Sequence, residues 1–248
     1  MDLKCDYDWY PGEAQACHQY KSSLDFLLFH VPVVSGQQWL PSTSPPVQSC
    51  TQNMDSRSLA IDRFFVDLVI NALLDRSVSV DAILCVYFRN IHRWLPVIPE
   101  QKFRARISEI HSSRSAELAL LLLAMYLLTE NEWGNTRNQR EGQQHLYQQC
   151  SCLVSFLLLV RGPSLELVQA GLLLILYELG SGSLEAAFLR VAACARLAYS
   201  LGLHVDESFV DDYSGAWCHA EERRRVWTAV YMMDRSVEQI TWIGGEID

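Results

Sequence analysis

The chain lacks any apolar stretch long enough to cross a membrane. Its longest unbroken apolar run, residues 118–128, is shorter than the roughly 20 residues that a spanning helix needs. The first residues, MDLKCDYDWY, contain no apolar secretory core. We therefore predict no membrane association, a buried helix at 118–128, and reduced cysteines in the cytoplasm or the nucleus.

Positive charge is also scarce. Lys and Arg number 20 against 29 Asp and Glu, so the formal net charge is -9 and the pI is near 5.2. DNA binding depends on Lys and Arg that release counterions from the phosphates, and an acidic chain opposes it. We expect this chain to reach DNA only indirectly, through a segment or partner outside it.

Motifs for catalysis and for common cofactors are missing. There is no GxSxG elbow, phosphate loop, dinucleotide fingerprint, HExxH motif or EF-hand spacing. GSGS at 180–183 is interpreted as the end of one helix and the cap of the next. The acidic residues Asp206, Glu207, Asp211 and Asp212 are interpreted as a solvated connector. We predict no catalytic and no cofactor-binding residues.

Metal ligands at chelating spacing are missing as well. No C-x2-C occurs, and Cys150 and Cys152 are two apart, so they point to different sides of a helix. The remaining Cys and His pairs are interpreted as structural or surface residues: Cys218 with His219, and Cys194 with His204. The sequence predicts no metal site in this chain.

Hydrophobic residues are abundant, at 50% of the chain, and from Leu59 onward they recur at helical spacing. No segment alternates polar and apolar residues for long enough to predict a sheet. The predicted fold is all-α, a multi-helix domain of packed helix pairs over residues 58–248. Helices are expected from 59 and at about 80–91, 101–110, 115–129, 140–160, 165–180, 183–201 and 220–238. Two prolines predict a bend at 94–99.

Residues 1–57 have a different composition. Pro and Gly recur among Ser and Gln, which predicts an irregular or disordered N-terminal segment. Its opening DYDWYPGE mixes acids with aromatics, as in activation segments that fold on a coactivator. The alternative is a mobile tail or a mispredicted first exon, and the composition favours this alternative.

The segment 184–201 predicts an amphipathic helix. Apolar and small residues share one face: Leu184, Ala187, Phe188, Val191, Cys194, Ala195, Ala198 and Leu201. The opposite face carries Glu185, Arg190, Arg196 and Ser200. Gly202 is expected to be the left-handed residue that ends the helix, with Leu203 folding back onto the last turn. His204 is expected to cap carbonyls at the helix end.

The last predicted helix has a narrow apolar stripe of Val226, Val230, Met233 and Val237, flanked by Trp227, Tyr231 and Asp234. Glu221 and Glu222 are both expected to pair with Arg225 on the surface, and Arg235 with Glu238. Because the RRR triplet at 223–225 is thereby partly neutralised, it is interpreted as a solvated face, not a phosphate site.

Three segments carry a resemblance to a known family. They are YFRNIHRWLPVIPEQKFRARI at 87–107, RLAYSLGLH at 196–204, and EERRRVW at 221–227 with Tyr231, Asp234 and Arg235 after it. Within the first, the matching residues are Tyr87, Phe88, Trp94, Pro96, Val97, Ile98 and Phe103. In this order the segments resemble the middle homology region of fungal zinc-cluster transcription factors, over about 60–240.

The resemblance implies an all-helical regulatory domain of a nuclear transcription factor, distal to a zinc cluster. It also implies a role in controlling metabolic or secondary-metabolite genes. Zinc is expected only in that cluster, which is absent from this chain. The implied partners are the transcription machinery or another regulator, bound by protein contacts, with a small-molecule effector and a dimer left open. Trp242 and Ile243 stand where the family has a GRP-like turn, and the chain is expected to be a truncated form.

A regulator of this kind would not be an enzyme. A second interpretation remains open beside it. It is a stand-alone helical protein that binds or converts a hydrophobic metabolite in an aromatic cleft. The aromatics expected in the interior are Tyr87, Phe88, Trp94, Trp227 and Tyr231. An upstream exon encoding C-x2-C-x6-C would favour the regulator.

Overall fold

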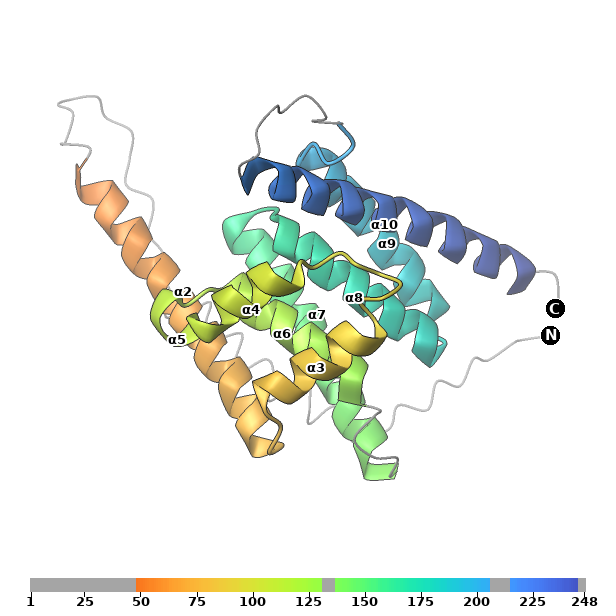
Figure 1. Ribbon diagram of the computed structural model, residues 1–248, viewed down its shortest axis with the longest axis horizontal. Coiled ribbons are helices and arrows are strands. Elements are labelled where there is room, and N and C mark those ends of the chain that lie inside the picture. Colours follow the sequence, from red (N-terminus) through yellow and green to blue (C-terminus); the bar gives the residue numbers. More distant parts are fainter. Residues whose placement is uncertain (1–47, 131–136, 206–214, 245–248) are drawn as a thin grey trace, which may run out of the picture. The chain divides into compact units, whose positions relative to one another are not determined.

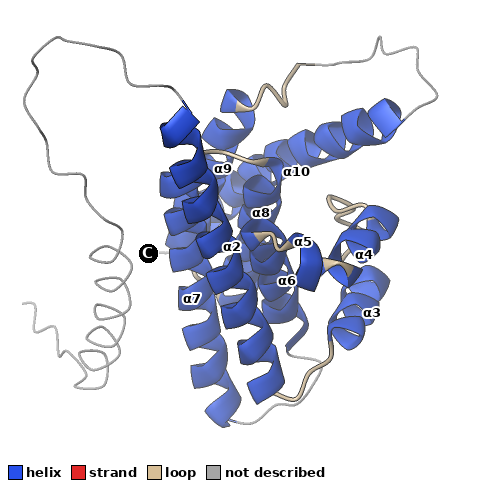
Figure 2. Ribbon diagram, turned by 90° about the vertical axis from the view of Figure 1, so that its left-hand side faces the viewer, coloured by secondary structure: helices blue, strands red, loops and turns tan. Residues whose placement is uncertain are grey.

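The computed structural model describes residues 48–130, 137–205 and 215–244, and no strand occurs in these ranges (Figures 1 and 2). The helices are α2 (Gln48–Asp75), α3 (Val80–Asn90), α4 (Glu100–Ser108), α5 (Ile110–Ser113), α6 (Ala116–Thr129), α7 (Arg137–Arg161), α8 (Leu165–Ser181), α9 (Leu184–Ser200) and α10 (Gly215–Gly244). The all-α prediction is confirmed. Within the described ranges, no helix combines the length and apolar character that a membrane span requires.

The first described helix begins earlier than the sequence predicts. α2 starts at Gln48, just after Pro45 and Pro46, whereas the helical domain is expected from residue 58. Proline is tolerated just before a helix and in its first turn, so two prolines at these sequence positions do not oppose a start at Gln48. Residues 1–47 lie outside the described ranges. The division of the chain at residue 58 stays a prediction.

Serine side chains begin three of the helices. Ser79, Ser115 and Ser164 each accept a hydrogen bond at 3.2 Å from the backbone N–H three residues later. Each therefore satisfies a donor that the first helical turn leaves unpaired. Ser183 precedes α9, but its side chain makes no such hydrogen bond. The prediction that GSGS caps this helix is therefore wrong for the side-chain hydrogen bond. Gly182, at φ +80°, ends α8 as expected.

The helix α6 lies at the centre of the described bundle. It packs against α2, α3, α7 and α8, and its residues from Leu118 to Leu127 are all buried. The prediction of a buried helix in this run is confirmed. At its N-terminal end, the Arg161 guanidinium of α7 lies 2.8 Å from Asp62 of α2 and 2.9 Å from Glu117 of α6. This ion-pair cluster ties three helices together.

The helices α8, α9 and α10 form the other side of the core, with α9 and α10 both packed on α8 and on each other (Figure 1). Gly171 of α8 faces Cys194 of α9 so closely that a Cβ on Gly171 would overlap the Cys194 Sγ. Small residues at this crossing let the two backbones approach, as the composition of the 184–201 segment indicates.

Burial confirms most of the predicted apolar faces. Along α10, Val226, Val230, Met233 and Val237 are all buried, as predicted. Along α9, Ala187, Val191, Cys194 and Ala198 are buried. Two residues of α9 depart from the prediction, because Phe188 is half exposed to solvent and Arg190 turns inward to an acidic partner.

Candidate functional site

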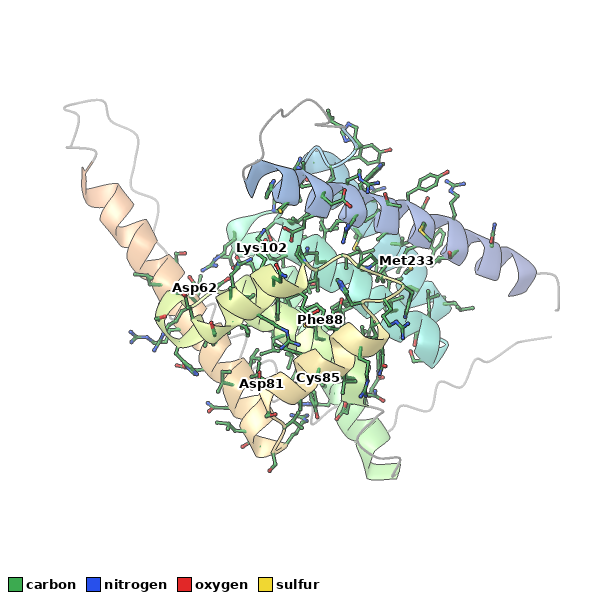
Figure 3. The ribbon with its side chains drawn as sticks, viewed as in Figure 1. Asp62, Asp81, Cys85, Phe88, Lys102 and Met233 are labelled. Atoms are coloured by element: carbon green, nitrogen blue, oxygen red, sulfur yellow. The ribbon has the colours of Figure 1, made fainter. Side chains whose placement is uncertain are left out.

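The early turns of α10 contact both of the other segments that carry the family resemblance. The first contact is made by Glu222, whose side chain is 6% exposed. The Lys102 Nζ of α4 lies 2.6 Å from the Glu222 Oε2, between α4 and α10 (Figure 3). An ion pair therefore joins the segment at 87–107 to the segment at 221–227. The expected surface pairing of Glu222 with Arg225 is wrong.

Gln169 of α8 completes this junction from the interior. Its side chain is 1% exposed, and its Nε2 donates to the Val97 carbonyl at 2.7 Å and to Glu222 Oε1 at 2.9 Å. Both donors of the amide are thus used, and both oxygens of Glu222 are bonded. We call Lys102, Gln169, Glu222 and the Val97 carbonyl the Glu222 junction. It links the bend, α4, α8 and α10.

The second contact is made by Arg223, which holds the end of α9. Leu203 N–H donates to Ala198 and Gly202 N–H to Tyr199, and Gly202 has φ +68°, so the predicted left-handed ending is confirmed. The Arg223 Nη2 donates to the Leu201 carbonyl at 3.0 Å. It therefore performs the capping that the sequence assigns to His204.

His204 is in an aromatic group instead. Its ring centroid lies 4.8 Å from that of Tyr199 and 6.1 Å from that of Trp227, and the Tyr199 and Trp227 rings are 5.1 Å apart at 72°. Edge-to-face contacts of this kind add to the stabilisation that burial provides. Trp227 thus fastens α10 to the end of α9, and the prediction of a capping His204 is wrong.

Surface charges flank the junction. Arg224 Nε lies 2.8 Å and Arg225 Nε 2.6 Å from the Glu221 carboxylate. The bonds from Arg224 and Arg225 lower the pKa of Glu221 to about 2. The predicted pairing of Glu221 with Arg225 is confirmed, and the arginine triplet is engaged with protein acceptors.

A second buried ion pair lies between α8 and α9. Glu178 is fully buried, and its Oε1 accepts from Arg190 Nε and from the Tyr147 hydroxyl, each at 2.6 Å. Arg190 Nη2 also donates to Ser151 Oγ at 2.9 Å. Charges buried in this way must be paired, and pairing here fixes α7, α8 and α9 to one another.

The five predicted interior aromatics divide into three groups. Tyr87 is fully buried and Phe88 is 7% exposed, so these two are confirmed. Trp227 is partly buried. Trp94 and Tyr231 are 59% and 57% exposed, and their placement in the interior is wrong. Trp94 follows the end of α3, where the bend interrupts the helical spacing from which a buried face can be predicted.

The cysteines that the sequence analysis considers lie in different environments. Cys150 and Cys194 are buried, and burial raises the pKa of each thiol to about 12, whereas Cys152 and Cys218 are exposed. Within the described residues, no three Cys, His, Asp or Glu side chains form a group that could hold a metal ion. The acidic connector at 206–212 lies outside those residues.

Near the end of α10, Arg235 contacts two neighbouring side chains, and its predicted pairing with Glu238 stays a prediction. Its Nη2 lies 3.3 Å from Asp234 Oδ2, and its guanidinium lies 5.8 Å from the centroid of the Tyr231 ring. The side chain of Glu238, its predicted partner, lies outside the described residues. The ion pair and the ring contact are both at the surface.

Comparison with known proteins identifies the family. Residues 84–238 match the fungal specific transcription factor domain, and this range runs from α3 to α10 and includes the whole Glu222 junction. The chain belongs to this family. It is a regulatory domain of fungal transcription factors, as the three ordered segments predict.

Two relatives extend the comparison. The chain is 31% identical to Transcription factor BOA15 of Botryotinia fuckeliana over 148 residues, which cover 59% of this chain and 80% of the relative. It is 28% identical to Transcription factor tazR of Aspergillus terreus over 160 residues, which cover 62% of this chain and only 25% of that longer protein. No solved structure matches the chain.

Four polar residues point inward although the sequence did not predict it: Gln169, Glu178, Arg190 and Glu222. For two of them the sequence holds a signal. Gln169 interrupts an apolar run in the predicted helix at 165–180. Glu222 lies four residues before Val226 and therefore on the same stripe as the apolar residues of α10. A charged or amide residue at such a position predicts a buried partner.

Proposed function

We propose that this fungal regulatory domain works in the nucleus and controls transcription through protein contacts, without catalysing a reaction. The observation that carries the proposal is the match of residues 84–238 to the family. Two relatives named as transcription factors support it. The genes that it controls are proposed to belong to a metabolic or secondary-metabolite cluster.

The pairing of the buried charged side chains across helix interfaces supports a role without catalysis. The buried acids of the described residues are Asp62, Glu178 and Glu222, and each is ion-paired with a cation, Asp62 with Arg161. Glu178 is bonded to Arg190 and Glu222 to Lys102, in both cases across a helix interface. These groups hold helices together, as expected for a domain that presents surfaces to partners.

DNA contact is proposed to be indirect, through a zinc cluster elsewhere in the assembled regulator. The formal charge of -9 supports this, and so do the arginines at 223–225, which are bonded to protein acceptors. A partner regulator, a dimer and a small-molecule effector belong to the same proposal.

Two measurements test the proposed function. In a gel-shift assay at physiological salt, the purified chain is expected to give no specific shift, and nanomolar binding by the chain alone would contradict indirect DNA contact. In a fungal reporter strain, the chain fused to a heterologous DNA-binding domain is expected to change transcription relative to that domain alone. An unchanged output would contradict a regulatory role.

A further inference from the structure

The C-terminal half of α7 is an apolar segment that the other described helices cover on one side. Residues 152–160 read CLVSFLLLV, and eight of these nine are apolar, yet of the nine only Leu157 is fully buried. Leu159 is 82% exposed and Val160 is 47% exposed. Figure 2 shows α7 at one edge of the described helices. A helix segment that is apolar all round is normally buried all round, so the described residues leave the outer side of this one uncovered.

The exposed residues of this outer side follow a regular spacing. Gln148, Cys152, Ser155 and Leu159 are successively four, three and four positions apart, and all four are exposed. Residues at this spacing lie on one stripe of a helix, and such a stripe is the surface along which two long helices pack against each other. We call these four residues the α7 face.

The centre of the α7 face is made of small residues. Cys152 and Ser155 let the backbone of another helix approach closely, and Leu159 at the end of the stripe offers a large apolar side chain. The Ser155 Oγ donates to the Ser151 carbonyl of its own helix at 3.1 Å. Burial of Ser155 against a partner therefore leaves no hydroxyl donor unpaired.

The same stretch of α7 has no formal charge. Residues 142–160 contain no Asp, Glu, Lys or Arg, although these residue types make up 20% of a chain with a net charge of -9. Copies of an acidic chain repel each other, but an uncharged stripe allows them to meet without burying a charge or placing like charges opposite each other. An acidic or a basic partner would find no opposite charge on α7 to pair with.

We propose that the α7 face binds the α7 face of a second copy of this chain about a two-fold axis. A contact of this kind uses the same patch on both copies. If the two helices are antiparallel, Cys152 faces Ser155 of the other copy and Leu159 faces Gln148; if they are parallel, each residue faces its equivalent. In both orientations small residues meet at the centre. The inference deepens the dimer of the proposed function, on which it rests, by naming the surface.

Sedimentation velocity of the full chain over a range of concentrations tests the proposal. A contact through one helix lies at the low end of interface sizes, so we expect a dimer with a dissociation constant of about 1–100 µM. Leu159→Asp is expected to weaken the dimer by about tenfold or more, because a carboxylate would have to be buried in the contact. The matched control is Leu74→Asp on α2, where the leucine is 67% exposed, and it should dimerise as the wild type does.

Disulfide cross-linking locates the contact. Under mild oxidation, Ser155→Cys is expected to give more covalent dimer than the wild type, because position 155 then lies within disulfide reach of position 152 or 155 of the other copy. Mass spectrometry of the linked peptides identifies which. The matched control is Ser200→Cys on α9, since Ser200 is also exposed and donates to a carbonyl of its own helix, that of Leu197, at 2.8 Å.

Several results would overturn the proposal. They are a chain that stays monomeric up to about 1 mM, ten times the weakest expected dissociation constant, a dimer that Leu159→Asp leaves intact, and equal cross-linking of Ser155→Cys and Ser200→Cys. A monomer that Leu159→Asp destabilises to urea, while Leu74→Asp does not, would assign the α7 face to another segment of the same chain. A monomeric chain that changes reporter transcription would reject this inference alone. A dimer that leaves the reporter unchanged would reject the proposed function.

Discussion

Lys102 and Glu222 lie 2.6 Å apart across the interface between α4 and α10, although 120 residues separate them in the chain. Through this pair and Gln169, the bend at 94–99 is connected to α10, and through Arg223 and Trp227 α10 is connected to the end of α9. The segments that carry the family resemblance are thus joined by direct contacts in the folded domain.

We expect Glu222→Ala to lower the free energy of unfolding by about 1–3 kcal/mol, because one buried N–H of the Gln169 amide loses its acceptor and Lys102 loses its ion-pair partner. The adjacent Glu221→Ala is the matched control. Its ion pairs are at the surface, so its cost should stay below about 1 kcal/mol. Urea denaturation of both variants measures the difference. Equal costs would show that the Glu222 junction does not stabilise the fold.

The pKa of Glu221 provides a test by pH. Its bonds with Arg224 and Arg225 lower the pKa from 4.5 to about 2 in the folded chain. Because the pKa of Glu221 is lower in the folded than in the unfolded chain, its ionised carboxylate stabilises the fold at pH values above 4.5. This contribution is lost as the pH falls from 4.5 towards 2. An NMR titration of the Glu221 carboxyl should show a midpoint clearly below 4.5. A midpoint near 4.5 would contradict these ion pairs.

Tyr87→Phe should leave stability unchanged or raise it. The Tyr87 hydroxyl is buried and has no hydrogen-bond partner among the described residues, so its removal relieves a desolvation cost of about 1–3 kcal/mol. The comparison is Tyr147→Phe, which removes a 2.6 Å bond to buried Glu178 and should destabilise the domain. Thermal unfolding of the two variants measures the contrast. A clear loss of stability in Tyr87→Phe would reveal a partner for that hydroxyl.

The crossing of α8 and α9 should not tolerate a larger residue at position 171. Gly171→Ala places a methyl group against the Cys194 Sγ and should cost about 1–3 kcal/mol. Gly180→Ala, in open space on the same helix, should stabilise it by about 1 kcal/mol. In a double-mutant cycle, adding Cys194→Ala should recover part of the Gly171→Ala cost. Additive effects would show that the two sites do not touch.

Much of the fold could be predicted from spacing, because a helix with one buried face repeats its apolar residues regularly. The stripe of α10 from Val226 to Val237 and the ending at Gly202 depend on local geometry, and both are confirmed. The buried faces of Tyr87 and Phe88 follow in the same way.

The junctions could not be predicted as completely, because a pattern of single residues does not identify a partner far away in the chain. Glu221 and Glu222 are adjacent and identical, yet one pairs at the surface and the other is buried against Lys102 and Gln169. An arginine such as Arg190 is expected at the surface from its residue type. Its side chain points inward because it pairs with the fully buried Glu178. Trp94 lies in the bend, where there is no helical repeat from which a buried or an exposed position could be predicted.

The most direct test of the account is a reporter assay in which the full chain is fused to a heterologous DNA-binding domain. Wild type, Glu222→Ala and Glu221→Ala are compared at matched protein levels. The account predicts that the wild type and Glu221→Ala change transcription alike, whereas Glu222→Ala, which breaks the contact between α4 and α10, loses most of the effect. If the wild-type chain leaves the reporter at the level of the DNA-binding domain alone, the regulatory function is contradicted.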